Sequence, residues 1–371
     1  MIPRGKLDIS FSSVFAGIRY CLSDLLGFKA GSGVKINKAP NEVYCLSVRT
    51  GFDLTLKSLH LNPGDELLVT NINIPDMFSI IAANGLIAVP LAVNKHTLNI
   101  KIDDIEHAIT PITRGILITH LFGAIMDTSA IVALAKKHGL FVIEDCAQAF
   151  NGTYQGDIGS DVVMYSFGLI KTNTALTGAV LRFNNSELAQ KIYYLNSLLP
   201  TQKTQRYLNK LFKALVIKIL TLKLPYTMLY WYSKRMGNDF DEILAGFTRG
   251  FPGEDVMSKI SFRPCLPNIR LLHKRLDRFD PSMIIKRTNS ALKRIANLPS
   301  EMKIGSMNLS NTYWVIPIES NDPQHFINVQ RAKGIDATAR ASSLVKIGDL
   351  GNSKDDELDL SKLVYLPPLA H

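Results

Sequence analysis

The sequence predicts an α/β protein with a mainly parallel sheet and helices on both faces of it. Between residues 40 and 185, short apolar runs alternate with segments of helical spacing. The expected strands are 67–69, 86–91, 115–120 and 140–143, and the expected helices between them are 76–84 and 127–138. Gly139 follows the last of these helices, as a glycine at a helix end does. Apolar strands separated by about 10–15 helical residues are typical of parallel sheets.

The length and composition predict two domains. The chain has 371 residues, of which 46% are hydrophobic, enough for a sizeable core. We expect a large domain over 1–245, which includes a basic, apolar helical insertion at about 188–240, and a smaller C-terminal α+β domain over 246–371. The elements expected in the smaller domain are helices at 268–278 and 282–296, and a βα-like tail at 314–318 and 329–335.

The cysteines and the net charge indicate which cofactors and partners are to be expected. Four cysteines lie far apart without the spacing of a zinc or redox motif, so we expect reduced, mostly buried thiols, no metal, and a cytoplasmic location. No secretory signal and no apolar run of spanning length is apparent. The net charge of +10 suits nucleic acid, anionic lipid or phosphorylated small molecules, and it does not choose among them.

Polar residues follow several of the expected strands. His120, Asp145 and Ser166 fall at strand ends, where ligands bind in open parallel sheets. A histidine at such a position is more often structural, so a role for His120 in a cofactor pocket is the less favoured interpretation. The geometry therefore directs attention to Asp145 and Ser166.

A carboxylate and an amine form the central candidate pair. Asp145 ends one expected strand, and Lys171 follows the next strand 26 residues later. Pyridoxal phosphate needs such a pair: an amine forms a Schiff base with its aldehyde, and a carboxylate keeps a proton on its ring nitrogen. The spacing alone could arise by chance in any α/β protein.

The motifs around this pair are more specific than the spacing. The chain reads Val-Ile-Glu-Asp-Cys-Ala-Gln-Ala over 142–149, Ser-Phe-Gly-Leu-Ile-Lys over 166–171 and Thr-Gly-Ala-Val over 177–180. These runs, with Leu-Asn-Pro-Gly-Asp-Glu-Leu over 61–67, resemble the DegT/DnrJ/EryC/StrS type of pyridoxal-phosphate-dependent aminotransferase, which aminates nucleotide-linked keto-sugars. The resemblance extends over about 40–185 and fades through 188–250.

The resemblance implies a fold and a set of cofactor-binding residues. The implied fold is the type I fold of aspartate aminotransferase, with a three-layer α/β/α large domain and a smaller C-terminal domain. Lys171 is expected as the Schiff-base lysine, Asp145 as the partner of the pyridine nitrogen, Gln148 as a group against the ring and Ser166 as a phosphate ligand. Some relatives carry histidine in place of this lysine and catalyse dehydration, so Lys171 favours transamination.

Two segments depart from the family pattern. Where the family usually has Ser-Gly-Thr-Ala-Ala for the phosphate, this chain has Arg49-Thr50-Gly51-Phe52-Asp53. A helix N-terminus favours phosphate, and Arg49 could add a charge-assisted contact or could be a solvated helix-end residue. Where the family often has an aromatic residue against the ring, Ile74 is expected instead.

The leading hypothesis is an enzyme, a cytoplasmic, homodimeric aminotransferase of polysaccharide biosynthesis. It would move an amino group from an amino acid, glutamate by resemblance, to a nucleotide-linked keto-sugar. Two alternatives stay open: a non-catalytic regulator or scaffold at the membrane, and a transaminase acting on a lipid-linked or non-sugar ketone. A spectral screen against nucleotide keto-sugars would separate them.

The basic insertion has two interpretations. The stretch 188–238 has no Asp or Glu, and 203–235 combines many Lys and Arg residues with apolar residues at helical spacing. It could be an interfacial helix at the inner surface of an anionic membrane, or a helical arm against the partner subunit of a dimer. Nucleic acid is not expected as a partner, because no recognised module accompanies the charge.

Overall fold

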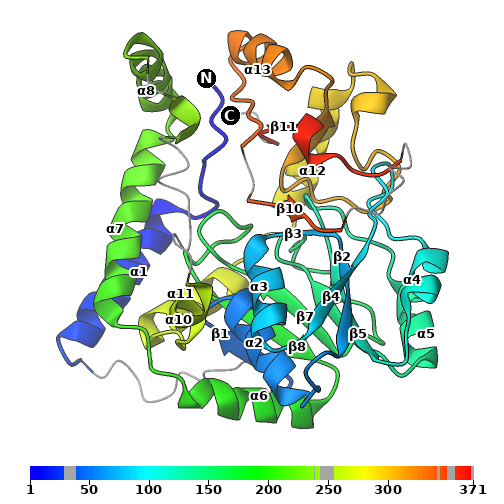
Figure 1. The fold of residues 1–371 in the computed structure, drawn as a ribbon. Coiled ribbons are helices and arrows are strands. Elements are labelled where there is room, and N and C mark those ends of the chain that lie inside the picture. Colours follow the sequence, from blue (N-terminus) through cyan, green and yellow to red (C-terminus); the bar gives the residue numbers. More distant parts are fainter. Residues whose placement is uncertain (29–38, 238, 243–254, 341–342, 349–355, 369–371) are drawn as a thin grey trace.

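A seven-stranded sheet forms the centre of the molecule (Figure 1). The computed structural model describes residues 1–28, 39–237, 239–242, 255–340, 343–348 and 356–368. The strand order is β1-β8-β7-β6-β5-β2-β4, and β8 is antiparallel to both of its neighbours while the other pairings are parallel. The strands are β1 (Glu42–Cys45), β2 (Glu66–Thr70), β4 (Ile87–Leu91), β5 (Thr113–Thr119), β6 (Phe141–Asp145), β7 (Val162–Ser166) and β8 (Ala179–Phe183).

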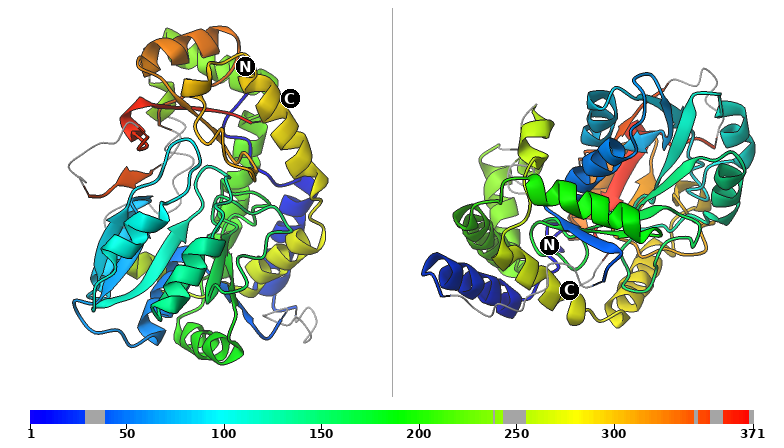
Figure 2. Two further views of the ribbon diagram at one scale, coloured as in Figure 1. Left: turned by 90° about the vertical axis from the view of Figure 1, so that its right-hand side faces the viewer. Right: turned by 90° about the horizontal axis from the view of Figure 1, so that it is seen from below.

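Helices cover both faces of this sheet, so the large part of the chain has three layers (Figure 2). One face packs against α2 (Val48–Ser58), α3 (Pro75–Ala83), α6 (Ser186–Leu198) and α10 (Val256–Ile260). The other face packs against α4 (Ile102–Ala108), α5 (Ser129–Lys137), α1 (Phe11–Leu25), α7 (Thr204–Leu220) and α11 (Leu266–Asp277). The expected α/β/α architecture with a mainly parallel sheet is confirmed.

The apolar residues on both faces of the strands explain this layering. Successive side chains of a strand point to opposite faces. Accordingly, Ile143 and Met164 lie in the core under α2 and α3, whereas Val142 and Tyr165 lie in cores on the opposite side. Because nearly all these positions are apolar, both faces of the sheet require a helical cover.

The C-terminal part combines helices with small sheets. Strand β9 (Ile316–Glu319) pairs antiparallel with β11 (Leu363–Leu366), and β10 (Val345–Lys346) pairs with β3 (Ile72–Asn73). The remaining elements are α12 (Ser282–Ile295), α13 (Pro323–Ala332) and two 3-10 helices, η1 (Ser300–Met302) and η2 (Leu360–Lys362). The division of the chain at 245/246 stays a prediction, since α11 packs on α1 of the large part.

The basic insertion expected at about 188–240 contains most of α6, and its part over 203–235 forms two further helices. Helix α7 ends at Leu220, and α8 (Lys223–Arg235) begins after a break at 221–222. Pro225 accounts for the break, because it has no N–H to donate to the carbonyl of Thr221 and tolerates only the first turn of a new helix. No helix among the described residues is long and apolar enough to cross a membrane. All four cysteines are free and buried, as expected.

Candidate active site

Two strand ends and one turn place the candidate residues. Asp145 ends β6 and Ser166 ends β7. Their positions along the strands match those of Ile143 and Met164, so both belong to the face covered by α2 and α3. Lys171 follows β7 on a tight turn, in which its N–H donates to the carbonyl of Gly168 at 3.0 Å.

The Lys171 amine lies in a confined setting. Its Nζ atom is 4.3 Å from the centre of the Trp314 ring. Burial lowers the pKa of Lys171 to about 8; the Asp145 carboxylate acts in the opposite direction and the Arg49 guanidinium lowers it further. A lysine with this pKa is about one-tenth unprotonated at pH 7, against roughly one part in three thousand for an ordinary lysine. It is therefore a usable nucleophile near neutral pH.

The Asp145 carboxylate is buried beside this amine. Its oxygen accepts a hydrogen bond from the N–H of Ala147 at 3.0 Å, and the amide of Asn73 donates a second bond. Burial raises the pKa of Asp145, while these bonds and the nearby Lys171 ammonium pull the pKa down. A cation placed next to this carboxylate would stabilise its ionised form.

The N-terminus of α2 brings Arg49 into the same site. Its guanidinium forms an ion pair with Asp76, with Nε and Oδ2 2.5 Å apart. Burial lowers the pKa of Arg49, and both Asp76 and Asp145 raise it. Arg49 is thus close enough to act electrostatically on both Asp145 and Lys171, and it is not a solvated helix-end residue.

Two other residues expected at the phosphate have partners within the protein. The Thr50 hydroxyl donates to the carbonyl of Ile260 at 2.9 Å, and its N–H donates to Ser47 Oγ, which caps α2. Gly51 packs against β8: a Cβ on it would lie 2.4 Å from Leu181 Cδ1. The structure therefore gives Thr50 and Gly51 structural contacts, and their binding to a phosphate stays a prediction.

The remaining expected residues lie around this group. Ser166 Oγ accepts from the N–H of Gly168 at 3.4 Å, in the turn that leads to Lys171. Ile74 is half-buried at the start of α3, directly after Asn73, and packs on the core below α2. Their roles as phosphate ligand and ring contact stay predictions.

Gln148 is buried and holds a turn of the main chain. Its Oε1 accepts from the N–H of Phe122 at 2.8 Å. Phe122 and Gly123 both have positive φ, at 59° and 102°. A Cβ on Gly123 would lie 2.4 Å from the main-chain nitrogen of Trp314, so only glycine permits this approach. Gln148 thus supports the turn on which the Trp314 segment rests.

Sequence reasoning did not assign Trp314 or Asn73 to the site. The Trp314 indole N–H donates to the carbonyl of Ile170 at 3.0 Å, which fixes the ring beside Lys171. Asn73 donates to Asp145 and, at 2.8 Å, to the hydroxyl of Thr119. The only sequence signal for Asn73 was its place before Ile74, and Trp314 carried no signal beyond its strand-like surroundings.

His120 and Glu144 form a buried network on the opposite face from Asp145. His120 Nδ1 accepts from the N–H of Met126 at 3.0 Å, so Nε2 carries the proton and donates to Glu144 Oε2 at 2.9 Å. Glu144 also accepts from Tyr154, Ser160 and the N–H of Asp157. Burial would raise the pKa of Glu144, but the bonds from His120, Ser160 and Tyr154 lower it to about 2. Cys146 lies beside this pair, and the network is a structural one.

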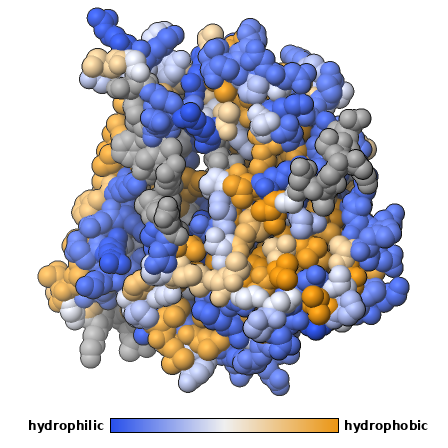
Figure 3. Space-filling view, in the orientation of Figure 1, coloured by the Kyte–Doolittle hydropathy of each residue, from blue (hydrophilic) through white to orange (hydrophobic). Residues whose placement is uncertain are grey.

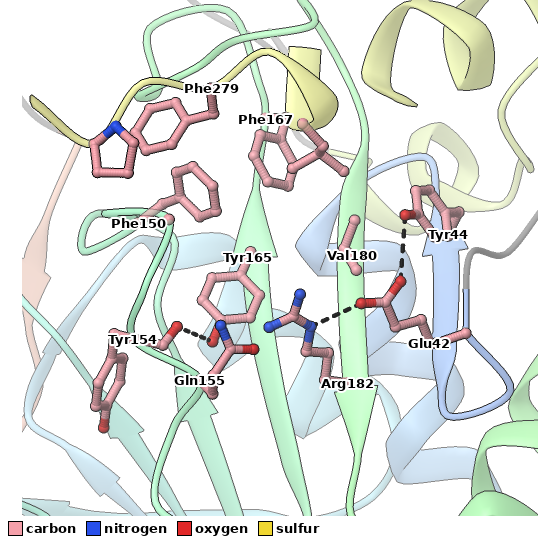
Figure 4. A pocket seen from close by; sticks show the side chains of 14 residues that line it. Glu42, Tyr44, Phe150, Tyr154, Gln155, Tyr165, Phe167, Val180, Arg182 and Phe279 are labelled. Carbon is pink, nitrogen blue, oxygen red and sulfur yellow. Dashed lines mark hydrogen bonds and ion pairs between the residues drawn. The ribbon is translucent and has the colours of Figure 1, made fainter. Parts of the chain in front are cut away.

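A cavity of about 300 Å³ lies away from Lys171 (Figure 4). It lies on the side of the sheet that carries Tyr165, Val180 and Arg182, opposite to the face of Asp145 and Ser166. Arg182 Nε donates to Glu42 at 2.8 Å across its floor. Glu42 also accepts from the Tyr44 hydroxyl, and the Tyr165 hydroxyl donates to the carbonyl of Tyr154. No candidate residue lines this cavity.

The three-layer fold with a buried lysine and carboxylate at the strand ends is that of type I pyridoxal-phosphate enzymes. Residues 38–219 match the model of the DegT/DnrJ/EryC1/StrS aminotransferase family. The resemblance inferred from the motifs is therefore confirmed over this part of the chain.

Two curated relatives carry names from polysaccharide biosynthesis and sugar transamination. The chain is 35% identical over 147 residues to the spore coat polysaccharide biosynthesis protein SpsC of Bacillus subtilis, which is 38% of each chain. It is 34% identical over 193 residues to dTDP-3-amino-3,6-dideoxy-alpha-D-galactopyranose transaminase of Aneurinibacillus thermoaerophilus, covering 49% of this chain and 53% of the relative. The matches thus span about half, or less, of these curated relatives.

Solved structures share the fold over nearly the whole chain. The sugar aminotransferase CalS13 of Micromonospora echinospora superposes with a TM-score of 0.63 at 20% identity, covering 99% of this chain and 94% of that one. NtdA of Bacillus subtilis, with bound cofactor PMP, superposes with a TM-score of 0.62 at 17% identity, covering 97% and 78%. At these identities the likeness establishes the fold.

The residues of this site fit the aldehyde and ring nitrogen of pyridoxal phosphate, the cofactor of the family. The donor set supplies an amine of lowered pKa for its aldehyde and a buried carboxylate for its ring nitrogen. At the phosphate end, Arg49 supplies a cation and α2 an N-terminus, although Arg49 is paired with Asp76.

Proposed function

We propose that this chain is a pyridoxal-phosphate-dependent aminotransferase with Lys171 as its catalytic residue. The amino donor would be an amino acid, glutamate by resemblance, and the acceptor a keto-sugar linked to a nucleotide. A homodimer, a cytoplasmic location and a role in polysaccharide biosynthesis belong to the same proposal. The observation that carries it is the burial of the Lys171 amine beside the Asp145 carboxylate, with the two pKa values displaced toward one another.

The chain's own residues perform three tasks in this proposal. Asp145 holds a proton on the ring nitrogen, Arg49 binds the phosphate together with the start of α2, and Lys171 moves the proton at the substrate carbon that bears the amine. Pyridoxal phosphate, when bound here, would supply an electron sink for the pair of electrons left on that carbon. Trp314 and Gln148 keep water from the amine and hold its surroundings in place.

Reductive trapping tests the cofactor assignment directly. The full chain is incubated with pyridoxal phosphate, reduced with borohydride, digested and mapped by mass spectrometry. The modification is expected on the peptide that contains Lys171, and Lys171→Ala should remove it. Lys57→Ala, which changes a half-exposed lysine on α2, is the matched control and should leave it in place. Modification spread over surface lysines, with none at Lys171, would contradict the proposal.

A half-reaction separates transamination from mere cofactor binding. A decrease in the pyridoxal absorbance on addition of glutamate would establish glutamate as the donor. Return of this absorbance on addition of a nucleotide keto-sugar would establish that sugar as the acceptor. A panel of keto-sugars carrying dTDP, GDP or UDP, together with a non-sugar ketone, covers the acceptor classes. Recovery with the non-sugar ketone alone would refute the sugar assignment and leave the transaminase in place.

A second candidate function is a non-catalytic scaffold with this fold. It is favoured by the phosphate end of the site, where Arg49 pairs with Asp76 and the Thr50 hydroxyl is committed to Ile260. Under this hypothesis glutamate would cause no spectral change, and Lys171→Ala would retain the biological activity of the chain. The trapping experiment and a complementation assay with Lys171→Ala therefore distinguish the two functions.

A further inference from the structure

Helix α1 carries an apolar stripe on its outer side. Its inner residues, among them Val14, Gly17 and Cys21, are buried against the molecule. The outward positions hold Phe11, Phe15 and Leu22, and Leu26 directly follows the helix; their exposed fractions run from 38% to 70%. Successive members are four or seven residues apart, which is one or two helical turns, so they lie along one line of the helix. A helix that buries one apolar face and exposes another requires an explanation for the second.

Helices α7 and α8 repeat this arrangement. The outward apolar residues of α7 are Phe212, Val216 and Ile219, and each is about half exposed. On α8 the corresponding residues are Leu224, Met228, Trp231 and Tyr232, which are 60% to 71% exposed. Tyr207 and Leu211 of α7 and Tyr226 of α8 face inward and are fully buried.

These helices form one continuous surface at an edge of the molecule. Helices α1 and α7 are in close contact, because a Cβ on Gly17 would lie 2.7 Å from Leu211 Cδ2. On the outer side, Lys218 Nζ of α7 lies 4.7 Å from the centre of the Phe11 ring of α1. Figure 1 places α1, α7 and α8 along the left edge, and Figure 3 shows apolar residues along that margin. We call this the three-helix surface.

The charge of the three-helix surface is almost entirely positive. The three helices carry eight Lys and Arg residues and a single acidic residue, Asp24. Arg19 lies within the apolar stripe of α1, and Lys213, Lys223 and Arg235 are exposed on α7 and α8. Apolar and cationic side chains are thus mixed on one face, and Asp24 is the one carboxylate that these three helices contribute.

We propose that the three-helix surface binds peripherally to an anionic lipid bilayer. Interfacial helices combine apolar side chains for the acyl boundary with Lys and Arg for the headgroups, and Trp and Tyr are favoured at that level. A second copy of this chain is a poorer occupant, because a twofold contact would press two cationic faces together. Because the three-helix surface includes α1, it is wider than the surface of α7 and α8 alone. Membrane binding by this surface is independent of the proposed aminotransferase activity.

Vesicle co-sedimentation of the full chain tests the proposal. The protein is mixed with vesicles of phosphatidylcholine alone, or of phosphatidylcholine with phosphatidylglycerol, at low and high salt. Binding is expected to the anionic vesicles and to fall with salt, because salt screens the attraction. Each Lys or Arg near an anionic surface contributes a factor of about five in affinity, so K213E/K223E should weaken binding by more than about 25-fold. F15S/W231S should weaken it at least about tenfold.

Two control variants carry substitutions of the same kind outside the three-helix surface. I158S/L309S replaces two apolar residues that are 93% and 104% exposed, and K101E/K362E reverses two exposed charges; both should bind as the parent does. Thermal unfolding is followed for every variant, and the two charge variants serve as the test should F15S/W231S lose stability.

Three outcomes would overturn the proposal. Failure to bind anionic vesicles, or equal binding by the three-helix variants and their controls, would exclude a membrane role for this surface. Conversion of a dimer to a monomer by F15S/W231S, seen by sedimentation velocity without lipid binding, would assign the surface to a protein interface. The borohydride trapping at Lys171 should be unchanged in all these variants, so failure here is distinguishable from failure of the proposed activity.

Discussion

Lys171 Nζ lies 4.3 Å from the centre of the Trp314 ring, and the indole N–H of Trp314 donates to the carbonyl of Ile170. The ring therefore covers the amine and is bonded to the residue next to it. Two effects on the lysine oppose one another, since an aromatic face favours the ammonium form while exclusion of water disfavours it. Burial is the largest influence on the Lys171 pKa, so exclusion of water prevails.

Replacement of Trp314 by Ala should raise the pKa of Lys171 from about 8 toward its ordinary 10.5, because water would reach the amine. Trp314→Phe keeps an aromatic cover and should change the pKa little. The pH dependence of pyridoxal phosphate capture measures both. A lower pKa in Trp314→Ala would mean that the cation–π contact outweighs exclusion of water.

Capture of pyridoxal phosphate by the parent protein should accelerate as pH rises and level off above about pH 8. The unprotonated amine is the nucleophile, and a folded-state pKa of about 8 places its titration there. Stopped-flow absorbance between pH 6 and pH 10 measures the rate. A midpoint near the usual pKa of lysine, about 10.4, would show that the amine is not desolvated during the reaction.

The ion pair between Arg49 and Asp76 predicts opposite effects of two substitutions on cofactor affinity. Arg49→Met should weaken binding of pyridoxal phosphate about tenfold or more, because a charge-assisted contact is lost. Asp76→Asn should strengthen binding, because it frees the guanidinium for the phosphate. Equilibrium dialysis gives both constants. Pyridoxal without its phosphate is the control ligand, and its affinity should change much less than that of pyridoxal phosphate. Unchanged affinity in Arg49→Met would remove Arg49 from the phosphate site.

Gly51→Ala should destabilise the protein by about 1–3 kcal/mol, because its Cβ would lie 2.4 Å from Leu181 Cδ1. Gly5→Ala is the control, with its nearest atom at 3.8 Å. Adding Leu181→Ala to Gly51→Ala should cost less than the sum of the two changes, since it removes the clashing atoms. Urea denaturation measures all four variants. A large loss of cofactor affinity without loss of stability would return Gly51 to the phosphate turn.

The Glu144 network predicts an acid-dependent loss of stability. The pKa of Glu144 is lowered from 4.5 to about 2, so the ionised form stabilises the fold above pH 4.5 and this contribution falls as pH drops toward 2. Glu144→Gln should cost about 3 kcal/mol at pH 7, and the difference from the parent should shrink below about pH 4. Urea midpoints across this pH range test it, and a constant difference would contradict it.

The sequence was informative where local pattern decides the structure. Short apolar runs predicted β2, β4, β5 and β6 within a residue or two. The motif around Asp145 and Lys171 singled out a pair that the structure places close enough to interact electrostatically. Trp314 could not be assigned, because it reaches Lys171 through a turn set by Gly123 and lies 144 residues from its bonding partner Ile170. Helix α1 was not among the helices expected from the sequence, and apolar residues lie on both of its faces.

The Thr50-Gly51 segment shows a different limit. Its sequence is that of a helix start suited to phosphate, and the structure does place it at the start of α2. Thr50 contacts Ile260 and Gly51 contacts Leu181, and both partners are far away in the sequence. Local sequence pattern does not show that these segments lie next to α2.

The approach of Gly123 to the main chain of Trp314 has a consequence for the order of events during synthesis. The sheet, Asp145 and Lys171 all leave the ribosome well before residue 314 does. Until that later segment docks, the amine remains open to water and should behave as an ordinary, protonated lysine. A nascent chain can thus complete its central layers while its lysine is still mostly protonated and slow toward aldehydes, and the lowered pKa arises only once the segment around residue 314 has docked.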